Sequence, residues 1–368
     1  MKIKQIGILE KEAFSPTVVP GINSIDLSAP IAIQYELSGK CNQRCIFCYN
    51  TWKNKSVLNS ISDTLLSEKR WKVVDKIIAS DIFEVILSGG EPLLIPEVCD
   101  IVSRFSKENI RIYLITNGIL LSKQMVNQLK EAGLEGIQIS LHGSNAEIHE
   151  AITQTPGSFN KTINGIKNAV KFFDDKSINI NMVLMKENYT DIESMIKMLN
   201  GIGQMSFSIG FLSKAGLATS LDTNKDLILE SFYKAMKISK ELDVDLGISG
   251  GFPFCLFPIE EQKKIIDISA NICDAGLNQL VISPNGDIRA CVCLPQILGN
   301  ILKDNIIEVW ENDPFLHFLR NLKHVPLVCY DCDLVSICKG GCRAAAYCYY
   351  GNFERIDPII EDKECGEC

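Results

Sequence analysis

Three cysteines near the start of the chain have the type and spacing of metal ligands. Cys41, Cys45 and Cys48 form the pattern C-x3-C-x2-C on one short polar segment. Three thiolates could hold three irons of a cubane cluster and leave the fourth iron open to bind a small molecule, as open zinc sites do. The same segment could bind zinc with a fourth ligand from elsewhere, although zinc sites more often use paired C-x2-C knuckles.

A second group of cysteines lies in the last third of the chain. Eleven of the fifteen cysteines occur from Cys255 onward. The run Cys329-x2-Cys332-x5-Cys338-x3-Cys342 has the close spacing of metal ligands. A zinc ribbon is one interpretation of this region alone. Iron–sulfur clusters are the other, because thiolate ligands select both.

The composition excludes several classes of protein. The chain has 368 residues, 46% of them hydrophobic, with a net charge of −8 and a pI of about 5.2. A mildly acidic protein has no global field that would gather nucleic acid or an anionic membrane surface. We find no signal peptide and no apolar run of membrane-spanning length, and therefore expect a cytoplasmic location. In a reducing compartment, an odd number of cysteines favours metal binding over disulfides.

Apolar segments of strand length alternate with segments of helical periodicity along the first two thirds of the chain. This alternation predicts an α/β fold in which repeated βαβ units curl into a partial (β/α)6 barrel of the TIM type. A longer helix is expected over Asp226–Leu242. The six expected strands cover Ile31–Leu37, Phe83–Leu87, Arg111–Ile115, Gly136–Leu141, Ile178–Met185 and Met205–Leu212. The helices between them cover Leu65–Ile78, Val98–Lys107, Ser122–Ala132, Phe159–Phe173 and Asp191–Leu199.

The unusual loops of this region all follow expected strands. The cysteine loop comes after the first strand, and a turn at Ser140 ends the fourth. Chemistry in barrels of parallel strands takes place at the carboxyl ends of the strands, so we expect the loops to share one site. The loops after the second and third strands are Gly89-Gly90-Glu91-Pro92 and Thr116-Asn117-Gly118.

The first cysteine loop resembles that of the radical S-adenosylmethionine (SAM) superfamily. The matching residues are Cys41, Cys45, Phe47 and Cys48, in a C-x3-C-x-aromatic-C loop directly after the first strand. The resemblance implies a [4Fe–4S] cluster whose open iron is chelated by the amino and carboxylate groups of SAM. One electron then cleaves the sulfonium and gives a 5′-deoxyadenosyl radical that abstracts a substrate hydrogen. An electron donor such as flavodoxin or ferredoxin is also implied.

The same resemblance implies contacts to SAM from the other loops. The loop at 89–92 is similar to the family's glycine-rich loop near the methionine amino group, because glycine lets backbone approach a ligand closely. Thr116 matches a further family position. Ser140 and Asn181 resemble nucleotide contacts, and polar barrel residues satisfied by their neighbours are the alternative interpretation of both. His142 stands where the family often has an acidic residue, and we expect it at a surface turn.

The later cysteines closely resemble the SPASM extension of that superfamily, which carries two auxiliary [4Fe–4S] clusters with interleaved ligands. The resemblance includes Gly286-x4-Cys291 and the turn at Cys338-Lys339-Gly340-Gly341-Cys342. By this resemblance the first auxiliary cluster would use Cys273, Cys291 and Cys342, and the second Cys329, Cys332, Cys338 and Cys365.

The fourth ligand of the first auxiliary cluster is left open by the spacing. Cys255 is our choice, with Cys293 next, and an iron open to substrate is a further alternative. Cys348 and Cys368 remain spare, and either could displace Cys365. The chain then divides into an N-terminal segment at 1–30, the radical SAM barrel at 31–215, a linking helix and strand at 216–250, and a small Cys-rich SPASM domain at 251–368.

The substrate is indicated only as a class. Many SPASM members modify ribosomally made peptides by cross-linking, thioether formation, epimerisation or decarboxylation, and we expect this function. Tetrapyrrole modification in heme pathways is the alternative, since the thirty residues before the barrel are too few for a leader-binding module. Val292 stands where sulfatase maturases have an acidic residue, which argues against that activity. A non-catalytic electron carrier is the third hypothesis, against which the barrel loops count, because a carrier needs neither the Gly89–Pro92 loop nor nucleotide contacts.

Overall fold

One sheet organises the part of the chain that the computed structural model describes, residues 27–50, 67–222, 224–268 and 273–360. Its strands lie in the order β10-β9-β8-β1-β2-β3-β4-β5-β6-β7. All neighbours from β8 to β7 pair in parallel, whereas β9 and β10 are antiparallel additions. The strands are β1 (Ala32–Ser38), β2 (Glu84–Gly89), β3 (Arg111–Thr116), β4 (Gly136–Ser140), β5 (Ile178–Leu184), β6 (Ser206–Phe211), β7 (Leu246–Ser249), β8 (Gln279–Ile282), β9 (Asp287–Arg289) and β10 (Gly299–Asn300).

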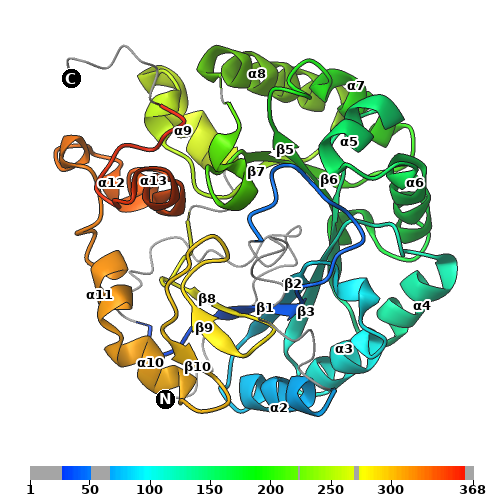
Figure 1. The fold of residues 1–368 in the computed structure, drawn as a ribbon. Coiled ribbons are helices and arrows are strands. Elements are labelled where there is room, and N and C mark those ends of the chain that lie inside the picture. The colour runs from blue at the N-terminus through cyan, green and yellow to red at the C-terminus, as the bar shows by residue number, and fades with distance from the viewer. Residues whose placement is uncertain (1–26, 51–66, 223, 269–272, 361–368) are drawn as a thin grey trace.

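The helices form a ring outside the curled sheet (Figure 1). Several begin at a side chain that accepts a hydrogen bond from the first turn, such as Ser122 for α4, Asn145 for α5 and Asn224 for α8. The helices are α2 (Ser67–Ile78), α3 (Val98–Ser106), α4 (Lys123–Glu131), α5 (Ala146–Thr153), α6 (Ser158–Ala169), α7 (Ile192–Asn200), α8 (Lys225–Leu242), α9 (Ile259–Ile268), α10 (Ile306–Asn312), α11 (Pro314–Arg320), α12 (Val335–Cys338) and α13 (Arg343–Tyr350).

The two faces of the sheet differ in polarity. Side chains that point to the helices, such as Ile33 and Tyr35 of β1, belong to the main hydrophobic core. The alternate residues of the same strand, Gln34 and Glu36, are polar and also buried. Because successive strand residues face opposite sides, the polar set lies on the inner face of the barrel. The fold therefore buries a polar interior that can receive a ligand.

The six strands expected from the sequence are all present, each within two residues of its expected ends, and the α/β partial-barrel fold is confirmed. The expected helix at 159–173 ends earlier, at Ala169. Helix α5 was not expected, since its eight residues are too few for a clear periodicity.

The sheet extends beyond the six expected strands. Strand β7, expected as part of a link, pairs in parallel with β6. Strand β8, from the Cys-rich region, pairs in parallel with β1, with Ile33 opposite Leu280. The barrel sheet thus continues across residue 250, and the later cysteines are connected rigidly to the first strand.

Candidate functional site

The first cysteine loop is fixed by helix α5. The backbone N–H of Arg44 donates to the carbonyl of Thr153 at 3.0 Å, and that of Ile46 donates to Ile152 at 3.0 Å. Within the loop, the N–H of Gln43 points at the Cys41 sulfur at 3.4 Å. The side chain of Cys45 is buried, and those of Cys41 and Cys48 are half-buried. The three thiols are therefore held on one ordered loop at the carboxyl end of β1.

Glu91 ties the glycine-rich loop to the end of β3. Its side chain is buried and accepts three hydrogen bonds, from the Leu93 N–H at 3.0 Å, the Thr116 hydroxyl at 2.7 Å and the Asn117 N–H at 2.9 Å. Thr116 was predicted as a SAM contact, and in the structure its hydroxyl braces Glu91. The carboxylate thus aligns two of the predicted loops.

Asn117 extends this connection to the cysteine loop. Its amide nitrogen donates to the Asn42 side chain at 2.6 Å and lies 3.9 Å from the Cys41 sulfur. The approach also needs glycine at position 90, because a Cβ there would lie 2.1 Å from the carbonyl oxygen of Lys40. The loops after β1, β2 and β3 consequently form one connected rim, as the sequence predicted.

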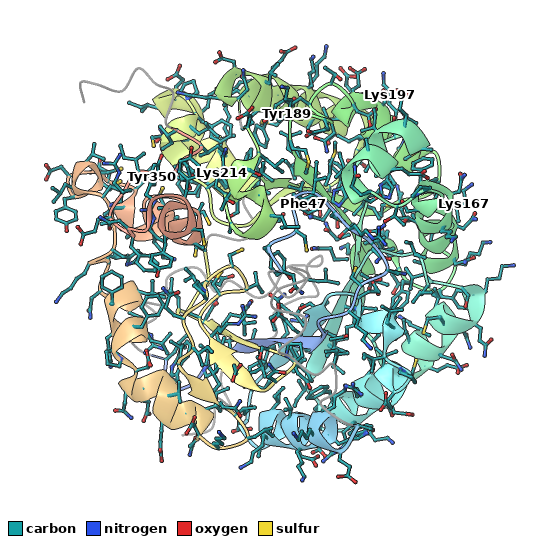
Figure 2. The ribbon with its side chains drawn as sticks, in the orientation of Figure 1. Phe47, Lys167, Tyr189, Lys197, Lys214 and Tyr350 are labelled. Atoms are coloured by element: carbon teal, nitrogen blue, oxygen red, sulfur yellow. The ribbon has the colours of Figure 1, made fainter. Side chains whose placement is uncertain are left out.

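An aromatic cluster covers the other side of the cysteine loop. The rings of Phe47 and His142 meet edge-on with centroids 4.7 Å apart, and His142 stacks on His149 at 6.1 Å. Figure 2 shows Phe47 toward the middle of the ring of helices, whereas Lys167 and Lys197 lie at its outer edge. The expectation that His142 sits at a surface turn is wrong, since it is 2% exposed beneath α5.

Both histidines of this cluster are neutral bases at physiological pH. Burial lowers the pKa of His142 to about 3 and that of His149 to about 4. Nδ1 of His142 accepts from the Val183 N–H at 3.3 Å, and Nδ1 of His149 accepts from the His142 N–H at 3.2 Å. These bonds fix the neutral imidazoles against the strand ends. The half-buried Phe47 ring, supported by these neutral imidazoles, is the ring of this cluster that the face of a heterocyclic base could contact.

Asn181 lies in a polar ladder on the inner face of β5, β6 and β7. Its side-chain oxygen accepts from Ser208 at 3.0 Å and from Ser249 at 2.7 Å. Asn179 shares the Ser208 hydroxyl at 2.8 Å, so both asparagines point inward. Ser140, half-buried at the end of β4, is in register with Asn181. The two residues predicted as nucleotide contacts are therefore neighbours on the inner face.

A buried ion pair that the sequence analysis missed crosses the barrel interior. Glu36 of β1 and Arg289 of β9 are 1% and 7% exposed, and their side chains form a salt bridge. Arg289 also donates to the carbonyl of Val292 at 3.0 Å. Burial and the Glu36 charge raise the pKa of the Tyr49 hydroxyl well above its usual value. The strict alternation of the first strand was the signal that Glu36 faces inward.

Cys273, Cys291 and Cys342 lie together at one side of the barrel. Burial raises the pKa of Cys342 to about 12, and the charges of Cys291 and Cys273 add to this shift. The Cys293 thiol donates to Cys291 and lowers the pKa of Cys291 to about 7. The thiol of Cys348 lies 3.6 Å from the carbonyl oxygen of Cys293. Three cysteines predicted for the first auxiliary cluster are thus neighbours, with Cys293 beside them.

Cys255, Cys329, Cys332 and Cys338 are the other predicted cluster ligands that the structure describes. Burial raises the pKa of Cys255 to about 11, and the charges that add to it are those of Cys338, Cys329 and Cys332. The segment that carries Cys255 lies beside both sets, since the Phe254 N–H points at the Cys338 sulfur at 3.4 Å and a Cβ on Gly251 would lie 3.2 Å from Cβ of Cys273. The assignment of Cys255 to the first auxiliary cluster stays a prediction. Cys365 and Cys368 fall outside the described residues.

The cysteine sets have the surroundings of cluster ligands. Backbone N–H groups point at the sulfurs of Cys41, Cys291, Cys338 and Cys342, each at 3.4 Å. Such hydrogen bonds stabilise thiolates and tune iron–sulfur potentials. Among the described residues, no three His, Cys, Asp or Glu side chains are arranged around a point for a single metal ion.

Comparisons with known proteins agree with this geometry. The family model of the radical SAM superfamily matches residues 35–199, and that of an iron–sulfur cluster-binding domain named SPASM matches residues 273–333. The chain therefore belongs to the radical SAM superfamily and carries a SPASM domain. It is a radical SAM enzyme that uses [4Fe–4S] clusters and SAM, which confirms the resemblance seen in the cysteine spacing.

Several curated proteins are similar over most of their length. The AdoMet-dependent heme synthase of Methanosarcina barkeri is 28% identical over 344 residues, which cover 90% of this chain and 96% of that protein. The mycofactocin maturase MftC of Mycobacterium tuberculosis is 26% identical over 329 residues, which cover 87% and 80%. The PqqA peptide cyclase of Ruegeria pomeroyi is 26% identical over 340 residues, which cover 90% and 87%.

Solved structures share the fold. The structure of Streptococcus suis SuiB bound to S-adenosylmethionine superposes with a TM-score of 0.72 at 20% identity, covering 91% of this chain and 78% of SuiB. That of anSMEcpe with bound AdoMet has a TM-score of 0.70 at 18% identity, covering 90% and 94%. Within the described residues, no helix has both the length and the apolar character needed to cross a bilayer.

Proposed function

We propose that this radical SAM enzyme modifies a ribosomally made peptide. The observation that carries the radical chemistry of this proposal is the connected rim, where Glu91 joins the loops after β2 and β3 and Asn117 reaches the cysteine loop after β1. Similar proteins named as a mycofactocin maturase, a PqqA peptide cyclase and a subtilosin biosynthesis protein support the peptide as substrate class.

The rim offers a residue for each part of the cofactor. Cys41, Cys45 and Cys48 would hold the cluster, which on reduction supplies the 5′-deoxyadenosyl radical from SAM. The half-buried Phe47 would pack against the adenine, and the neutral His142 would support the Phe47 ring from behind. Further contacts to SAM are proposed from the inner face and the rim loops, at Gly89, Gly90, Glu91, Pro92, Thr116, Ser140 and Asn181. An external one-electron donor such as flavodoxin or ferredoxin would reduce the cluster.

The charge of the barrel interior favours a peptide over a tetrapyrrole. A tetrapyrrole with several propionate groups carries several negative charges, and binding it in a buried site requires unpaired cations. Arg289 on the inner face is already paired with Glu36. Arg289 therefore offers no unpaired charge to a propionate, and the other buried cations, Lys214 and Arg343, donate to backbone carbonyls. A peptide backbone is neutral and needs only hydrogen-bonding groups, which the polar inner face supplies.

Tetrapyrrole modification is the second candidate. It is favoured by one observation, the similarity to the heme synthase of Methanosarcina barkeri over 96% of that protein. Its test uses the same purified enzyme as the test of the first candidate. If the enzyme converts a propionate-bearing tetrapyrrole and forms deoxyadenosine at the same time, tetrapyrrole modification is its function.

The proposal is tested with anaerobically purified protein whose clusters have been reconstituted. SAM and dithionite are added with each of the peptides encoded by short reading frames beside the gene. We expect 5′-deoxyadenosine to form, and one peptide to change as well. Loss of two hydrogens would mark a cross-link or thioether, and loss of carbon dioxide together with two hydrogens an oxidative decarboxylation. Epimerisation leaves the mass unchanged and is detected by deuterium uptake from the solvent.

Two variants show whether the activity depends on the first cluster. A Cys45→Ala variant tests whether the first cluster is required, and Cys99→Ala, a cysteine on α3 beside Met125, is the matched control. Deoxyadenosine formation with no peptide altered, but with a tetrapyrrole altered, would overturn the peptide proposal. No deoxyadenosine above background with any substrate would leave the carrier hypothesis instead.

A further inference from the structure

The loop that follows strand β6 touches both cysteine regions of the molecule. We call residues 212–221 the β6 loop, which includes the 3-10 turn η5 (Gly216–Ser220). The backbone N–H of Leu217 donates to the carbonyl of Cys48, a predicted ligand of the SAM-binding cluster, at 3.0 Å. The hydroxyl of Ser213 lies 3.4 Å from the sulfur of Cys342, a predicted ligand of the first auxiliary cluster. The β6 loop therefore connects the two predicted cluster sites directly.

Packing fixes the β6 loop against its neighbours on both sides. Gly216 has a φ of +59°, and a Cβ at this position would lie 2.6 Å from the carbonyl oxygen of Tyr49. The backbone of the β6 loop thus lies directly on the first cysteine loop. Lys214 is 7% exposed, and its ammonium group lies 5.3 Å from the ring centroid of Tyr349 on α13. Ser213 directly precedes this buried lysine, so the same packing fixes its backbone position.

Cys342 is held in place from its own side as well. It is the N-cap of α13, and its sulfur accepts from the N–H of Ala345 at 3.4 Å. Its own N–H donates to the buried carboxylate of Asp357 at 2.6 Å. A cysteine that binds a metal is a thiolate and has no proton to donate. When Cys342 binds a cluster, the hydroxyl of Ser213 is therefore the donor of the hydrogen bond between them.

This hydroxyl sets Cys342 apart from the other auxiliary cysteines that the structure describes. The sulfurs of Cys291 and Cys338 each accept from a backbone N–H at 3.4 Å. Of the described auxiliary cysteines, Cys342 alone has a hydroxyl at hydrogen-bond distance as well. Hydrogen bonds to the sulfurs set part of the potential of an iron–sulfur cluster. Because an added electron makes a cluster more negative, each donor stabilises the reduced state more than the oxidised one.

We propose that Ser213 is a positioning residue that acts through Cys342. Its hydroxyl donates to the Cys342 thiolate and makes the auxiliary cluster at this cysteine easier to reduce. The β6 loop keeps this donor at a fixed place relative to the SAM-binding cluster, because the same loop is hydrogen-bonded to Cys48. The inference rests on the proposed function in one respect, the binding of an auxiliary cluster by Cys342. It does not depend on whether the substrate is a peptide or a tetrapyrrole.

The first experiment measures how easily each cluster is reduced in the full chain, with its clusters reconstituted under nitrogen. Samples are poised at a series of potentials, and the reduced clusters are followed by electron paramagnetic resonance. The signal that changes when SAM is added belongs to the first cluster, and the remaining signals belong to the auxiliary clusters. At the potential that half-reduces the affected auxiliary cluster in the wild type, Ser213→Ala should lower its ratio of reduced to oxidised form about two- to tenfold. The other clusters should be unchanged.

Two further variants separate the effect of the hydroxyl from an effect on the fold. Ser213→Thr keeps the hydroxyl and should retain the wild-type ratio. Ser220→Ala removes an exposed hydroxyl from the same loop and is the matched control, which should leave every cluster unchanged. The iron content should equal that of the wild type in all three variants, so that a lost cluster is not mistaken for a shifted potential.

A second measurement detects the hydrogen bond itself. Electron–nuclear double resonance of the reduced protein, prepared in H2O and in D2O, reveals exchangeable protons close to a cluster. One such proton coupling should be present in the wild type and in Ser213→Thr. The same coupling should be absent from Ser213→Ala.

Three results would contradict this inference. Unchanged ratios together with an unchanged proton coupling in Ser213→Ala would overturn it and leave the proposed function intact. Loss of about four irons per chain in Ser213→Ala would also overturn it, because the hydroxyl would then be needed to hold the cluster. A wild-type protein whose only reduced signal responds to SAM would overturn the auxiliary clusters themselves, and the inference with them.

Discussion

The two cysteine regions of this molecule obtain their ligands in opposite ways. The first region places Cys41, Cys45 and Cys48 on one loop of eight residues, and helix α5 and the rim loops merely hold that loop in position. The second draws its cysteines from segments between positions 255 and 348 that only the tertiary fold brings together. A local motif therefore defines the catalytic cluster, whereas the auxiliary sites are defined by packing.

The two regions also depend on different parts of the sheet. The first loop follows β1 directly, so it is positioned by one strand end. Cys273 precedes β8 and Cys291 follows β9, and these two strands extend the same sheet beyond β1. A rigid sheet thus sets the distance between the two regions. Fixed separation suits electron transfer between a substrate radical and an auxiliary cluster.

The largest expected effect comes from breaking the first region alone. Cys45→Ala removes one of three ligands and should reduce deoxyadenosine formation to background, with a loss of about four irons per chain. The auxiliary irons should remain, because no described auxiliary cysteine comes from this loop. Metal analysis and a deoxyadenosine assay measure both quantities. Loss of all iron in this variant would contradict the independence of the two regions.

The Glu36–Arg289 ion pair connects the two regions. Breaking it should give the second largest effect, a loss of unfolding free energy. Glu36→Ala leaves Arg289 buried without its partner, and removing one member of such a pair costs about 3–5 kcal/mol of unfolding free energy. Replacing both, in Glu36→Gln/Arg289→Met, should restore most of this loss. Denaturant unfolding under nitrogen measures the free energy of unfolding of the wild type and of both variants.

The exposed pair Glu193–Lys197 on α7 is the matched control for this ion pair. Glu193→Ala should leave the unfolding free energy unchanged within error, because exposed pairs contribute little. A double variant as unstable as Glu36→Ala alone would show that Arg289 has another essential partner.

Glu91→Gln tests the connection within the rim. The amide keeps one acceptor oxygen but presents a donor to one of the N–H or O–H groups that the carboxylate accepts. We expect a loss of about 1.5–3 kcal/mol in stability. Deoxyadenosine formation should fall by up to about 100-fold, since small displacements of bound groups slow reactions strongly.

A variant on the outer surface separates these two effects of Glu91. Glu97, before α3, pairs with Arg70 away from the rim. Glu97→Gln should lower stability slightly and leave deoxyadenosine formation per folded molecule unchanged. If Glu91→Gln behaved in the same way, the rim connection would be structural and unrelated to SAM.

The sequence predicted the parts of this molecule that depend on neighbours along the chain. The strands follow from apolar runs, and the cysteine loop follows from its own spacing. The burial of His142 was missed because the short helix α5, which covers it, has too little periodicity to recognise. The partner of Glu36 could not be predicted, since Arg289 lies 253 positions away along the chain. Contacts over such separations are set by the closing of the sheet.

The smallest predicted effect concerns the buried histidines beside the first loop. Because the pKa of His142 in the folded protein, about 3, is below its unfolded value of about 6.5, the unfolded chain binds a proton that the folded protein refuses. The contribution of His142 to the free energy of unfolding should therefore be present in full well above pH 6.5. It should decrease as the pH is lowered through that value. His142 contributes a loss of about 1.4 kcal/mol between pH 7.5 and 5.5.

His142→Asn should remove this part of the acid dependence, and the exposed His317→Asn serves as the control. Denaturation midpoints of the holoprotein at pH 7.5 and 5.5 give the measurement. His149 and His324, whose pKa values burial also lowers to about 4, should preserve the remaining slope in the variant. An identical slope in His142→Asn and wild type would mean that the imidazole beside Phe47 reaches water. The rim would then be open on the side where the structure closes it.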